Sequence, residues 1–446
     1  MQMNIPVVSE SEYDVVVVGG GTAGFCAAVA AARNGAKTAL IERFGMLGGT
    51  MTVGGVAAPA LFHAHGKQII SGIGWELFEH LAEKGYASLP PAPFTARHPL
   101  LAVEINPLQT ACEMADMALE AGVELRYHQQ LVHANTENGT VTDIAVITYS
   151  GLEKIKAKMF IDASGEGTLC AMAGAEYELG QELQPATLNF YLGGHETGKA
   201  DLADVQKMYT EALETGELSV HDVWGGGIGS FVGGRGRKES QGKNYAQNPG
   251  CNANHVYPFN GADAESRTMG EIEGRRSIRR LLQWLNKNVP GHENSYAVSV
   301  SPIVSARESR RILGNAYITG DDYVNGVAKE DSVCYSFYPI DVHRGDTKSA
   351  LDNEFLTEGR VPGIPMGALT AKGFENLFRA GRIASGDRRA QSAYRVQASC
   401  MAMGQAVGTA AAMCVKENIS APSVDVPALR KTLDAQGAIV PGVTKI

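Results

Sequence analysis

The sequence has few of the features that mark secreted, metal-binding or nucleic-acid-binding proteins. Its seven cysteines are scattered, and none stands in a Cys-x-x-Cys pair, which argues against a disulfide framework, a zinc knuckle or a cysteine-ligated iron–sulfur cluster. Proline is sparse, with 18 residues, so the chain is neither collagen-like nor a proline-rich low-complexity sequence. The 48 acidic residues outnumber the 39 basic ones, and a formal charge of −9 gives no general reason to bind nucleic acid. We therefore expect a globular protein without a metal site or a nucleic-acid partner.

Long apolar runs and a basic N-terminal region are both missing. The first basic residue is Arg33, so no positively charged segment precedes an apolar stretch and a secretory signal is not expected. The best candidate for a membrane span, residues 401–415, is short, contains Gln405 and is rich in glycine and alanine. These absences predict a cytoplasmic protein with no membrane span.

Glycine is the residue in excess. The chain has 52 glycines in 446 residues, whereas an average usage of about 7% would give about 31. Ten of them fall in residues 19–55 and seven in residues 225–236. Because proline is not also frequent, this glycine must serve folded backbone.

The first glycine cluster begins between two predicted strands. Residues 13–18 form a short β-branched run typical of a strand buried on both faces. Residues 25–34 are alanine-rich and predict a helix, and residues 37–41 predict a second strand. The motif Gly19-Gly-Gly-Thr22-Ala23-Gly24 joins the first strand to the helix. A glycine fingerprint in this strand–helix context predicts a dinucleotide-binding turn.

Each position of the motif has a physical role in binding a dinucleotide. Gly19 permits a sharp turn, Gly21 lets the backbone approach a pyrophosphate, and Gly24 lets the helix pack closely on the sheet. The helix N-terminus then faces the phosphates. Glu42, directly after the second strand, is suited to accept both ribose hydroxyls of an adenosine. A 2′-phosphate would be repelled there, which disfavours NADP.

The rest of the chain alternates helices and strands at both ends and loses that rhythm in the middle. A helix is predicted at 107–121, and strands at 123–127, 131–134, 141–149 and 158–162. Residues 376–382 again predict a strand followed by glycine, and 401–415 a helix that can pack tightly against a sheet or a cofactor. The prediction is an α/β fold with a discontinuous, Rossmann-like binding domain formed by 10–178 and 340–420. A mixed α+β substrate domain is inserted at 179–339, and 421–446 form a tail that packs on the binding domain.

Ten motifs together resemble one family. They are the glycine motif at 18–24, Gly-Gly-Thr at 48–50, 66–72, Phe-Ile-Asp-Ala-Ser-Gly-Glu-Gly at 160–167, 183–187, 306–312, Tyr-Pro-Ile-Asp-Val-His at 338–343, Ala-Gly-Arg at 380–382, 390–396 and 401–405. The chain resembles the FAD-dependent oxidoreductases related to the fumarate reductase and succinate dehydrogenase flavoproteins, within the glutathione-reductase-like flavoprotein fold. The resemblance covers nearly the whole chain and implies FAD, but it says little about the substrate.

The resemblance implies which residues hold FAD. The ADP half would lie on the glycine motif and Glu42, and the helix N-terminus near residue 396 would point at the flavin and stabilise its reduced anion. The residues implied are Gly19, Gly21, Thr22, Ala23, Gly24 and Glu42 for the ADP half, Arg43, Gly49 and Thr50 along the pyrophosphate and ribityl chain, Val132 at the adenine, Ala163 and Gly165 at the adenosine, Gly381 and Arg382 at the pyrophosphate, and Arg395 and Val396 at the flavin.

One departure from the related flavoproteins concerns how FAD is attached. Succinate dehydrogenase-type flavoproteins often bind the flavin covalently through a histidine near the Gly-Gly-Thr segment. This chain has Thr50-Met-Thr52 there, and its nearest histidines are His63 and His65. We therefore expect FAD to be bound non-covalently.

Candidate catalytic residues are concentrated around 338–344. Tyr338, Asp341 and His343 lie within six residues, and on an extended strand Asp341 and His343 share one face, which suits an aspartate-oriented histidine base. A structural histidine beside a domain crossover is an equally good interpretation. Tyr394 is a candidate active-site phenol or a packing residue.

Arginine-rich and glycine-rich segments leave two further alternatives open. Arg307, Arg310 and Arg311 are suited to bind a substrate carboxylate, of which Arg307 is the candidate, or to form internal ion pairs with neighbours such as Glu308. Four arginines between 275 and 280 are expected on a solvated helix face. The glycine-rich segment at 225–236 is either a lid over the flavin or a surface loop, and His255 is a further residue of the inserted domain that could face the substrate.

The sequence thus predicts an oxidoreductase that transfers a hydride between FAD and a small polar organic substrate, with carboxylates among the candidates. The other two interpretations are an O₂-using flavin monooxygenase or oxidase, and a non-catalytic flavin-bound redox sensor. The expected partners are the substrate and an electron acceptor or donor that the sequence does not identify. Whether the chain forms a homo-oligomer is left open.

Overall fold

β1 (Val7–Val18) lies within a seven-stranded sheet in the computed structural model, which describes residues 6–95, 101–196, 198–223, 228, 232, 253–345 and 351–445. The valines at its end are almost fully buried, as the β-branched run predicts. The sheet has the order β7 (Glu124–Arg126), β2 (Thr38–Ile41), β1, β10 (Gly151–Asp162), β9 (Thr140–Thr148) and β8 (Gln130–Glu137), and β19 (Leu377–Arg379) pairs with β10.

The parallel strands of this sheet end in register. Val18 pairs with Ile41 on one side and with Asp162 on the other, and Asp162 pairs in turn with Arg379. β9 and β8 continue antiparallel as a hairpin beside β10. The carboxyl ends of β2, β1, β10 and β19 therefore meet at one edge, where open α/β sheets bind their ligands.

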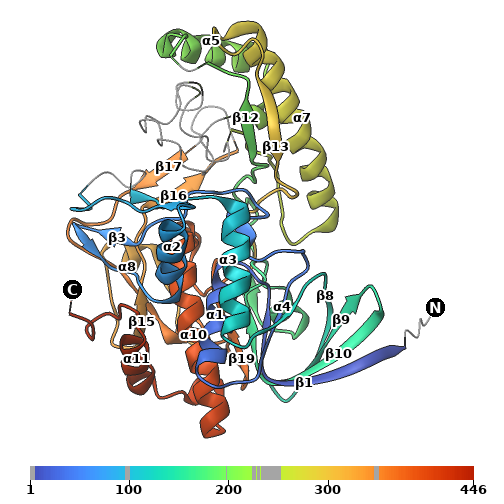
Figure 1. The fold of residues 1–446 in the computed structure, drawn as a ribbon, viewed down its shortest axis with the longest axis vertical. Helices are drawn as coiled ribbons and strands as arrows, with labels where there is room; N and C mark the ends of the chain where they lie inside the picture. Colours follow the sequence, from blue (N-terminus) through green and yellow to red (C-terminus); the bar gives the residue numbers. More distant parts are fainter. Residues whose placement is uncertain are drawn as a thin grey trace.

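Two helices that are far apart in the sequence pack side by side against this sheet, α1 (Thr22–Arg33) and α10 (Gln397–Glu417) (Figure 1). Gly404 and Gly408 make the close approach possible, because a Cβ on either would lie 2.1 Å from a carbonyl oxygen of α1, that of Ala23 or Ala27. Among the described residues, α10 is the one helix long and apolar enough to cross a membrane, yet 83% of that stretch is buried inside the protein.

A second core lies in the part of the chain inserted between the sheet strands. β12 (Phe190–Gly193) and β13 (Tyr296–Val300) form a two-stranded sheet beside α5 (Leu202–Thr215) and α7 (Ala264–Asn288), at the top of Figure 1. Its buried side chains run from Ala186 to Val304. We call residues 186–304 the inserted unit.

We call the buried side chains of this sheet and of the helices around it the first core. The remaining α-helices and strands of the described residues lie outside the seven-stranded sheet and the inserted unit. They are α2 (Ile73–Glu83), α3 (Pro107–Glu120), α4 (Thr168–Met172), α8 (Gly320–Val324), α9 (Arg388–Tyr394), α11 (Val426–Ala435), and the strands β3 (His63–Ala64), β4 (Lys67–Gln68), β5 (Ala87–Ser88), β6 (Glu104–Ile105), β11 (Tyr177–Glu178), β14 (Arg311–Ile312), β15 (Ser332–Tyr335), β16 (Ile340–His343), β17 (Leu351–Glu354) and β18 (Gly363–Pro365). Leu429 and Leu433 of α11 are buried in this core.

The α/β fold class predicted from the sequence is confirmed, with differences at the ends of elements. β1 begins at Val7 and not at residue 13, because the exposed polar stretch before Tyr13 pairs with β10 and carries no buried pattern. α10 extends the predicted 401–415 at both ends. Ile318, Tyr323 and Val333 lie in the first core, whereas the sequence boundary at 339 places them in the inserted domain.

Candidate functional site

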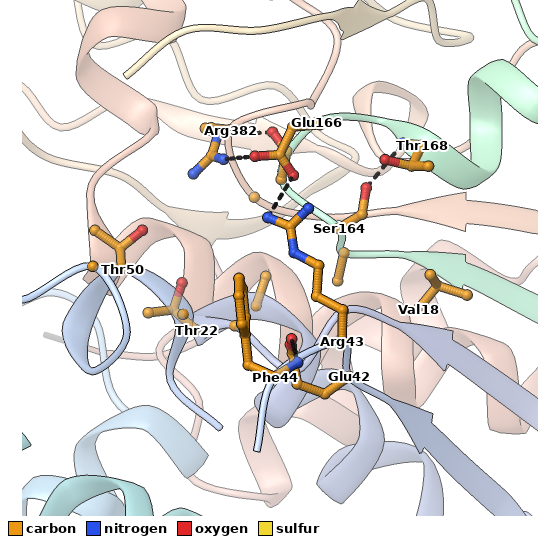
Figure 2. A pocket seen from close by; sticks show the side chains of 18 of the residues that line it. Val18, Thr22, Glu42, Arg43, Phe44, Thr50, Ser164, Glu166, Thr168 and Arg382 are labelled. Atoms are coloured by element: carbon orange, nitrogen blue, oxygen red, sulfur yellow. Dashed lines mark hydrogen bonds and ion pairs between the residues drawn. The ribbon is translucent and has the colours of Figure 1, made fainter. Parts of the chain in front are cut away.

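A cleft opens at the carboxyl ends of the parallel strands (Figure 2). It is bounded by the glycine turn after β1, the segment after β2, the turn after β10 and the turn after β19. Residues 303–306, at the C-terminal end of the inserted unit, close it on another side. The cleft therefore runs past the ends of several strands, where an extended dinucleotide binds in open α/β sheets.

The glycines of the first turn meet different steric demands. Gly19 has φ +102°, which a residue with a side chain rarely adopts. A Cβ on Gly24 would lie 1.8 Å from the carbonyl oxygen of Gly19, so Gly24 is required for the turn to pack against its own helix. A Cβ on Gly21, by contrast, would have its nearest neighbour at 4.0 Å. The bare backbone at Gly21 thus serves the open cleft and is not required for folding.

Two helix N-termini border the cleft. Thr22 and Ala23 open α1, and Gln397 and Cys400 lie in the first turn of α10. In the part of the chain that the structure describes, no side chain caps either helix and no acidic residue stands in either first turn. The N–H of Ala398, in the first turn of α10, donates to the Ala60 carbonyl oxygen at 3.1 Å. The positive dipole ends of both helices still suit an anionic ligand.

Glu42 is held at the end of β2 by the backbone. Its carboxylate accepts hydrogen bonds from the N–H of Gly20 at 2.6 Å and from the N–H of Phe44 at 2.9 Å. Burial raises the pKa of Glu42, and the two backbone donors work against that rise. Each oxygen retains a lone pair, so this cleft-lining carboxylate can also accept ribose hydroxyls.

Glu166 gathers three arginines beside the cleft. Its Oε1 accepts from Arg267 at 2.6 Å and from Arg382 at 2.9 Å, and Arg43 lies 3.8 Å from its Oε2, as Figure 2 shows for Arg43 and Arg382. Burial raises the pKa of Glu166, but the three guanidinium groups outweigh it and the pKa is lowered. Three cations around one carboxylate leave the region net positive, which suits a pyrophosphate.

A buried chain of hydrogen bonds lies next to the cleft. Asp341 and His343, both on β16, are joined by a contact of 3.2 Å between Oδ2 and Nε2. The other ring nitrogen of His343 lies 2.7 Å from Nε2 of His255, whose Nδ1 lies 2.5 Å from the carbonyl oxygen of Val223. Arg395 lines the cleft and donates to the Asp341 backbone carbonyl and carboxylate at 3.3 and 3.4 Å. Arg395 thus connects the cleft to this histidine chain.

The charges of this region are strongly perturbed. Burial, helped by Arg307, lowers the pKa of His343 to about 4, although Asp341 acts in the opposite direction. Burial raises the pKa of Asp341, but the hydrogen bond from His343 and the two arginines bring it down to about 2. Burial and Arg395 lower the pKa of Arg307 to about 9. A cluster of ionisable groups with shifts of this kind is typical of a functional site.

Most of the residues that the resemblance implies for FAD line the described cleft, and three do not. The lining residues are Gly19, Gly21, Thr22, Ala23, Glu42, Arg43, Gly49, Thr50, Ala163, Gly165, Gly381, Arg382 and Arg395. Gly24 packs behind the turn. Val132 is 42% exposed and its neighbours Gln130 and Leu131 line the cleft instead, while Val396 serves as the N-cap of α10.

The candidate catalytic residues lie in different places in the structure. His343, Asp341 and Arg307 come together beside Arg395, and Tyr338 packs partly buried against the first core. Tyr394 is not at the cleft: it is fully buried, and its hydroxyl donates to the Ala384 carbonyl at 2.8 Å, so it is a packing residue. Arg311 forms the expected ion pair with Glu308 at 2.8 Å.

Sequence reasoning missed several cleft residues. Glu166, Gln397, Cys400 and the segment 303–306 all line the cleft, yet the sequence pattern indicates none of them as a ligand. Glu166 stands within the motif at 160–167, but its three arginine partners are distant in the sequence and give no local signal. Arg280, expected on a solvated face, is paired with Asp222 and Glu273. Most of the glycine-rich segment at 225–236 lies outside the described residues.

The fold and the cleft define a Rossmann-like dinucleotide-binding protein. The sequence profile of the family "FAD dependent oxidoreductase" matches residues 14–433, and the chain belongs to that family. FAD is therefore its cofactor and the protein is an oxidoreductase.

Individual relatives are similar over much shorter stretches. Dihydrolipoyl dehydrogenase of Trypanosoma brucei brucei is 57% identical over 53 residues, which are 12% of this chain and 11% of that one. Thiamine thiazole synthase of Aeropyrum pernix is 28% identical over 175 residues, 36% of this chain and 58% of that one. The chain thus spans about a tenth of the length of the first of these curated relatives, and about half that of the second.

Among solved structures, a geranylgeranyl bacteriochlorophyll reductase-like protein from Thermoplasma acidophilum is 12% identical with a TM-score of 0.46. The match covers 96% of this chain and 83% of that one.

Proposed function

We propose that the protein transfers a hydride between FAD and a small polar organic substrate, with His343 handling the proton. One observation supports this assignment above the others. His343 is a buried ring between Asp341 and His255, and Asp341 is bound by Arg395, which lines the dinucleotide cleft. Hydride transfer from an alcohol, amine or saturated acid also requires a proton acceptor, and an aspartate-bound histidine is suited to that role.

The described residues fit FAD at the cleft. Glu42 would hold the adenosine ribose, the first turn of α1 and the cluster around Glu166 would receive the pyrophosphate, and the α10 N-terminus would lie toward the flavin. FAD supplies the hydride acceptor or donor when it is bound. Arg307 and Arg395, both beside Asp341, would orient an anionic substrate, so a carboxylate is the substrate class that we favour.

Two finer points also remain proposals. We propose that FAD is non-covalent, because His63 stacks on Phe94 at 3.9 Å and contacts Trp75, and the described cleft is lined by other residues. We also retain the relationship to the fumarate reductase and succinate dehydrogenase flavoproteins as a proposal that rests on the ten sequence motifs. We further propose that the protein exchanges electrons with a second acceptor or donor and that it is cytoplasmic.

The experiment is an anaerobic metabolite screen. Oxidised, FAD-loaded protein is mixed with small organic acids, alcohols and amines, and bleaching of the flavin absorbance is followed by stopped flow. We expect one class to bleach the flavin, and His343→Asn to slow that step by about 10²–10⁴-fold with FAD still bound. His133→Asn, an exposed histidine on β8, serves as the control and should bleach at the wild-type rate.

Other outcomes would overturn parts of the proposal. If only the reduced protein turns over, with unsaturated acids, the physiological direction is reduction. Rapid reoxidation by O₂ with a hydroxylated product would replace the proposal with a monooxygenase. Unchanged bleaching in His343→Asn would remove His343 from its role, and no electron exchange with any compound would favour a flavin-bound sensor.

A further inference from the structure

The hydrogen-bonded chain through His255 and His343 has an acceptor at each end. The Val223 carbonyl oxygen has no proton to donate, and the ionised Asp341 carboxylate has none either. Between them stand two imidazole rings and three short contacts. Each contact needs one proton to become a hydrogen bond, whereas two neutral rings carry only two N–H protons. One of the three contacts therefore lacks a proton whenever both rings are neutral.

The distances indicate which contact lacks it. The His255–Val223 contact is 2.5 Å and the His255–His343 contact is 2.7 Å, whereas the His343–Asp341 contact is 3.2 Å. Two acceptors facing each other without a proton repel, so the shorter contacts must hold the protons. The opposite arrangement would set an unprotonated Nδ1 of His255 against a carbonyl oxygen at 2.5 Å.

We propose that His255 is a positioning residue for His343. By donating its Nδ1–H to the Val223 carbonyl, His255 presents Nε2 as an acceptor, and this holds the proton of His343 on Nδ1. Nε2 of His343 faces Asp341. Among the ring nitrogens of His255 and His343, it is then the one position where a proton is gained or lost. The assignment of this proton to the catalysed reaction rests on the proposed function. The assignment of the tautomers of the two rings does not depend on it.

The proton step itself balances without rearranging the other bonds. A substrate that gives up a hydride also gives up a proton, and the electron pair of the broken bond to that proton stays on the substrate as its new double bond. The Asp341 carboxylate, on the side toward the cleft, takes up this proton and passes a proton to the lone pair of Nε2, which completes the third hydrogen bond and leaves Asp341 ionised. In the reverse direction the same N–H is broken and the proton returns to the substrate.

The groups that face His343 set the conditions for this step. Asp341 and Arg395 lie on the side toward the cleft, His255 faces it from the inserted unit, Arg307 lies nearby, and Tyr338 lies beside Arg307. Burial and Arg307 together lower the pKa of His343 to about 4, so at neutral pH its Nε2 is free to accept. An anionic substrate beside the arginines would weaken their effect and raise that pKa.

The tautomers can be measured directly in the FAD-loaded protein. Histidine labelled with ¹⁵N gives separate signals for protonated and unprotonated ring nitrogens, and His343→Asn identifies the signals of His343. At about pH 7.5, well above the ordinary histidine pKa, we expect protonated Nδ1 and unprotonated Nε2 on both rings. A His343 that carries its proton on Nε2 in the wild-type protein would overturn the proposal by itself, without any variant.

A variant of His255 tests the cause. In His255→Phe the acceptor for His343 Nδ1 is gone, and we expect the His343 proton to move to Nε2, where Asp341 accepts it. His292→Asn, a buried histidine elsewhere in the inserted unit, should leave the His343 signals unchanged. Unchanged His343 tautomers in His255→Phe would contradict the positioning role.

The two proposals fail in different ways. If the tautomers are as stated but His343→Asn reduces its flavin at the wild-type rate, the positioning by His255 stands and the proposed function of His343 does not. If His343 is needed for flavin reduction but carries its proton on Nε2, the proposed function of His343 stands and the positioning by His255 does not.

Discussion

The dinucleotide cleft and the histidine chain lie next to each other and are joined by Arg395. They differ in whether backbone or side chains form them. The cleft is formed largely by backbone: glycines without side chains, two uncapped helix N-termini and the ends of aligned strands. The histidine chain is formed by side chains that are buried and hydrogen-bonded to one another. The backbone-lined cleft suits a cofactor that is the same in every turnover, whereas the histidine chain suits the chemistry of one particular substrate.

Two glycines of the turn after β1 differ in a similar way, one facing the cleft and the other packed behind the turn. Gly24 is required because its own turn leaves no room, whereas Gly21 borders open space in the cleft, where we propose that FAD passes. Substitutions at these neighbouring positions should therefore have different consequences, one for folding and the other for the cofactor.

The largest effect is expected from Gly24→Ala. The new Cβ would lie 1.8 Å from the Gly19 carbonyl oxygen, so the turn and α1 must move apart. We expect the free energy of unfolding to fall by about 3 kcal/mol or more, measured by urea denaturation. Gly21→Ala is the matched control, with 4.0 Å of clearance, and should unfold like the wild type. Equal stability of the two variants would show that the tight turn does not limit folding.

The next effect concerns binding. In Gly21→Leu the side chain projects into the cleft at the place where the backbone is open, so folding without FAD should be preserved. We expect the dissociation constant for FAD to rise by about 100-fold, which is about 2.7 kcal/mol, because the ligand can no longer approach the turn. Titration of flavin fluorescence measures this constant. An unchanged affinity would mean that the cofactor does not pass Gly21.

The smallest effect tests the histidine chain through pH. The pKa of His343 is about 4 in the folded protein against about 6.5 when exposed, so the unfolded state takes up its proton first as the pH falls. The stability contributed by neutral His343 is full above about pH 6.5, declines between about pH 6.5 and 4, and is lost below. The wild type should therefore lose about 1 to 2 kcal/mol more than His343→Asn over this range. Denaturant titrations at about pH 7.5, 6 and 4.5 measure the difference, and parallel curves would contradict it.

The difference between the two regions also explains how much the sequence could predict. The strand, glycine turn, helix and second strand at 13–42 are local in sequence, so the order of residues alone assigns each position a role. Asp341 and His343 could be paired as well, because residues two apart on a strand share a face.

What could not be predicted depends on long-range contacts. His255 and His343 are 88 residues apart, and Arg267 reaches Glu166 from the inserted unit across 101 residues. Neither pair leaves a periodic or spacing signal, because each joins a residue of the inserted unit to a residue outside it. Tyr394 is a residue for which the local sequence was misleading. Its position before α10 suggested a site role, but its hydroxyl donates a hydrogen bond to the Ala384 carbonyl.

The contact between Gly404 of α10 and Ala23 of α1 also constrains how the molecule is made. The glycine turn and α1 leave the ribosome well before α10, because Gly404 lies 381 residues after Ala23. Until then α1 lacks its partner and the cleft lacks the walls formed by Gly381, Arg382 and Arg395. Pairings of such long sequence separation form slowly. Cofactor binding therefore has to wait until α10 has been synthesised, and a chain that is truncated or stalled before α10 would expose an alanine-rich helix with nothing to cover it.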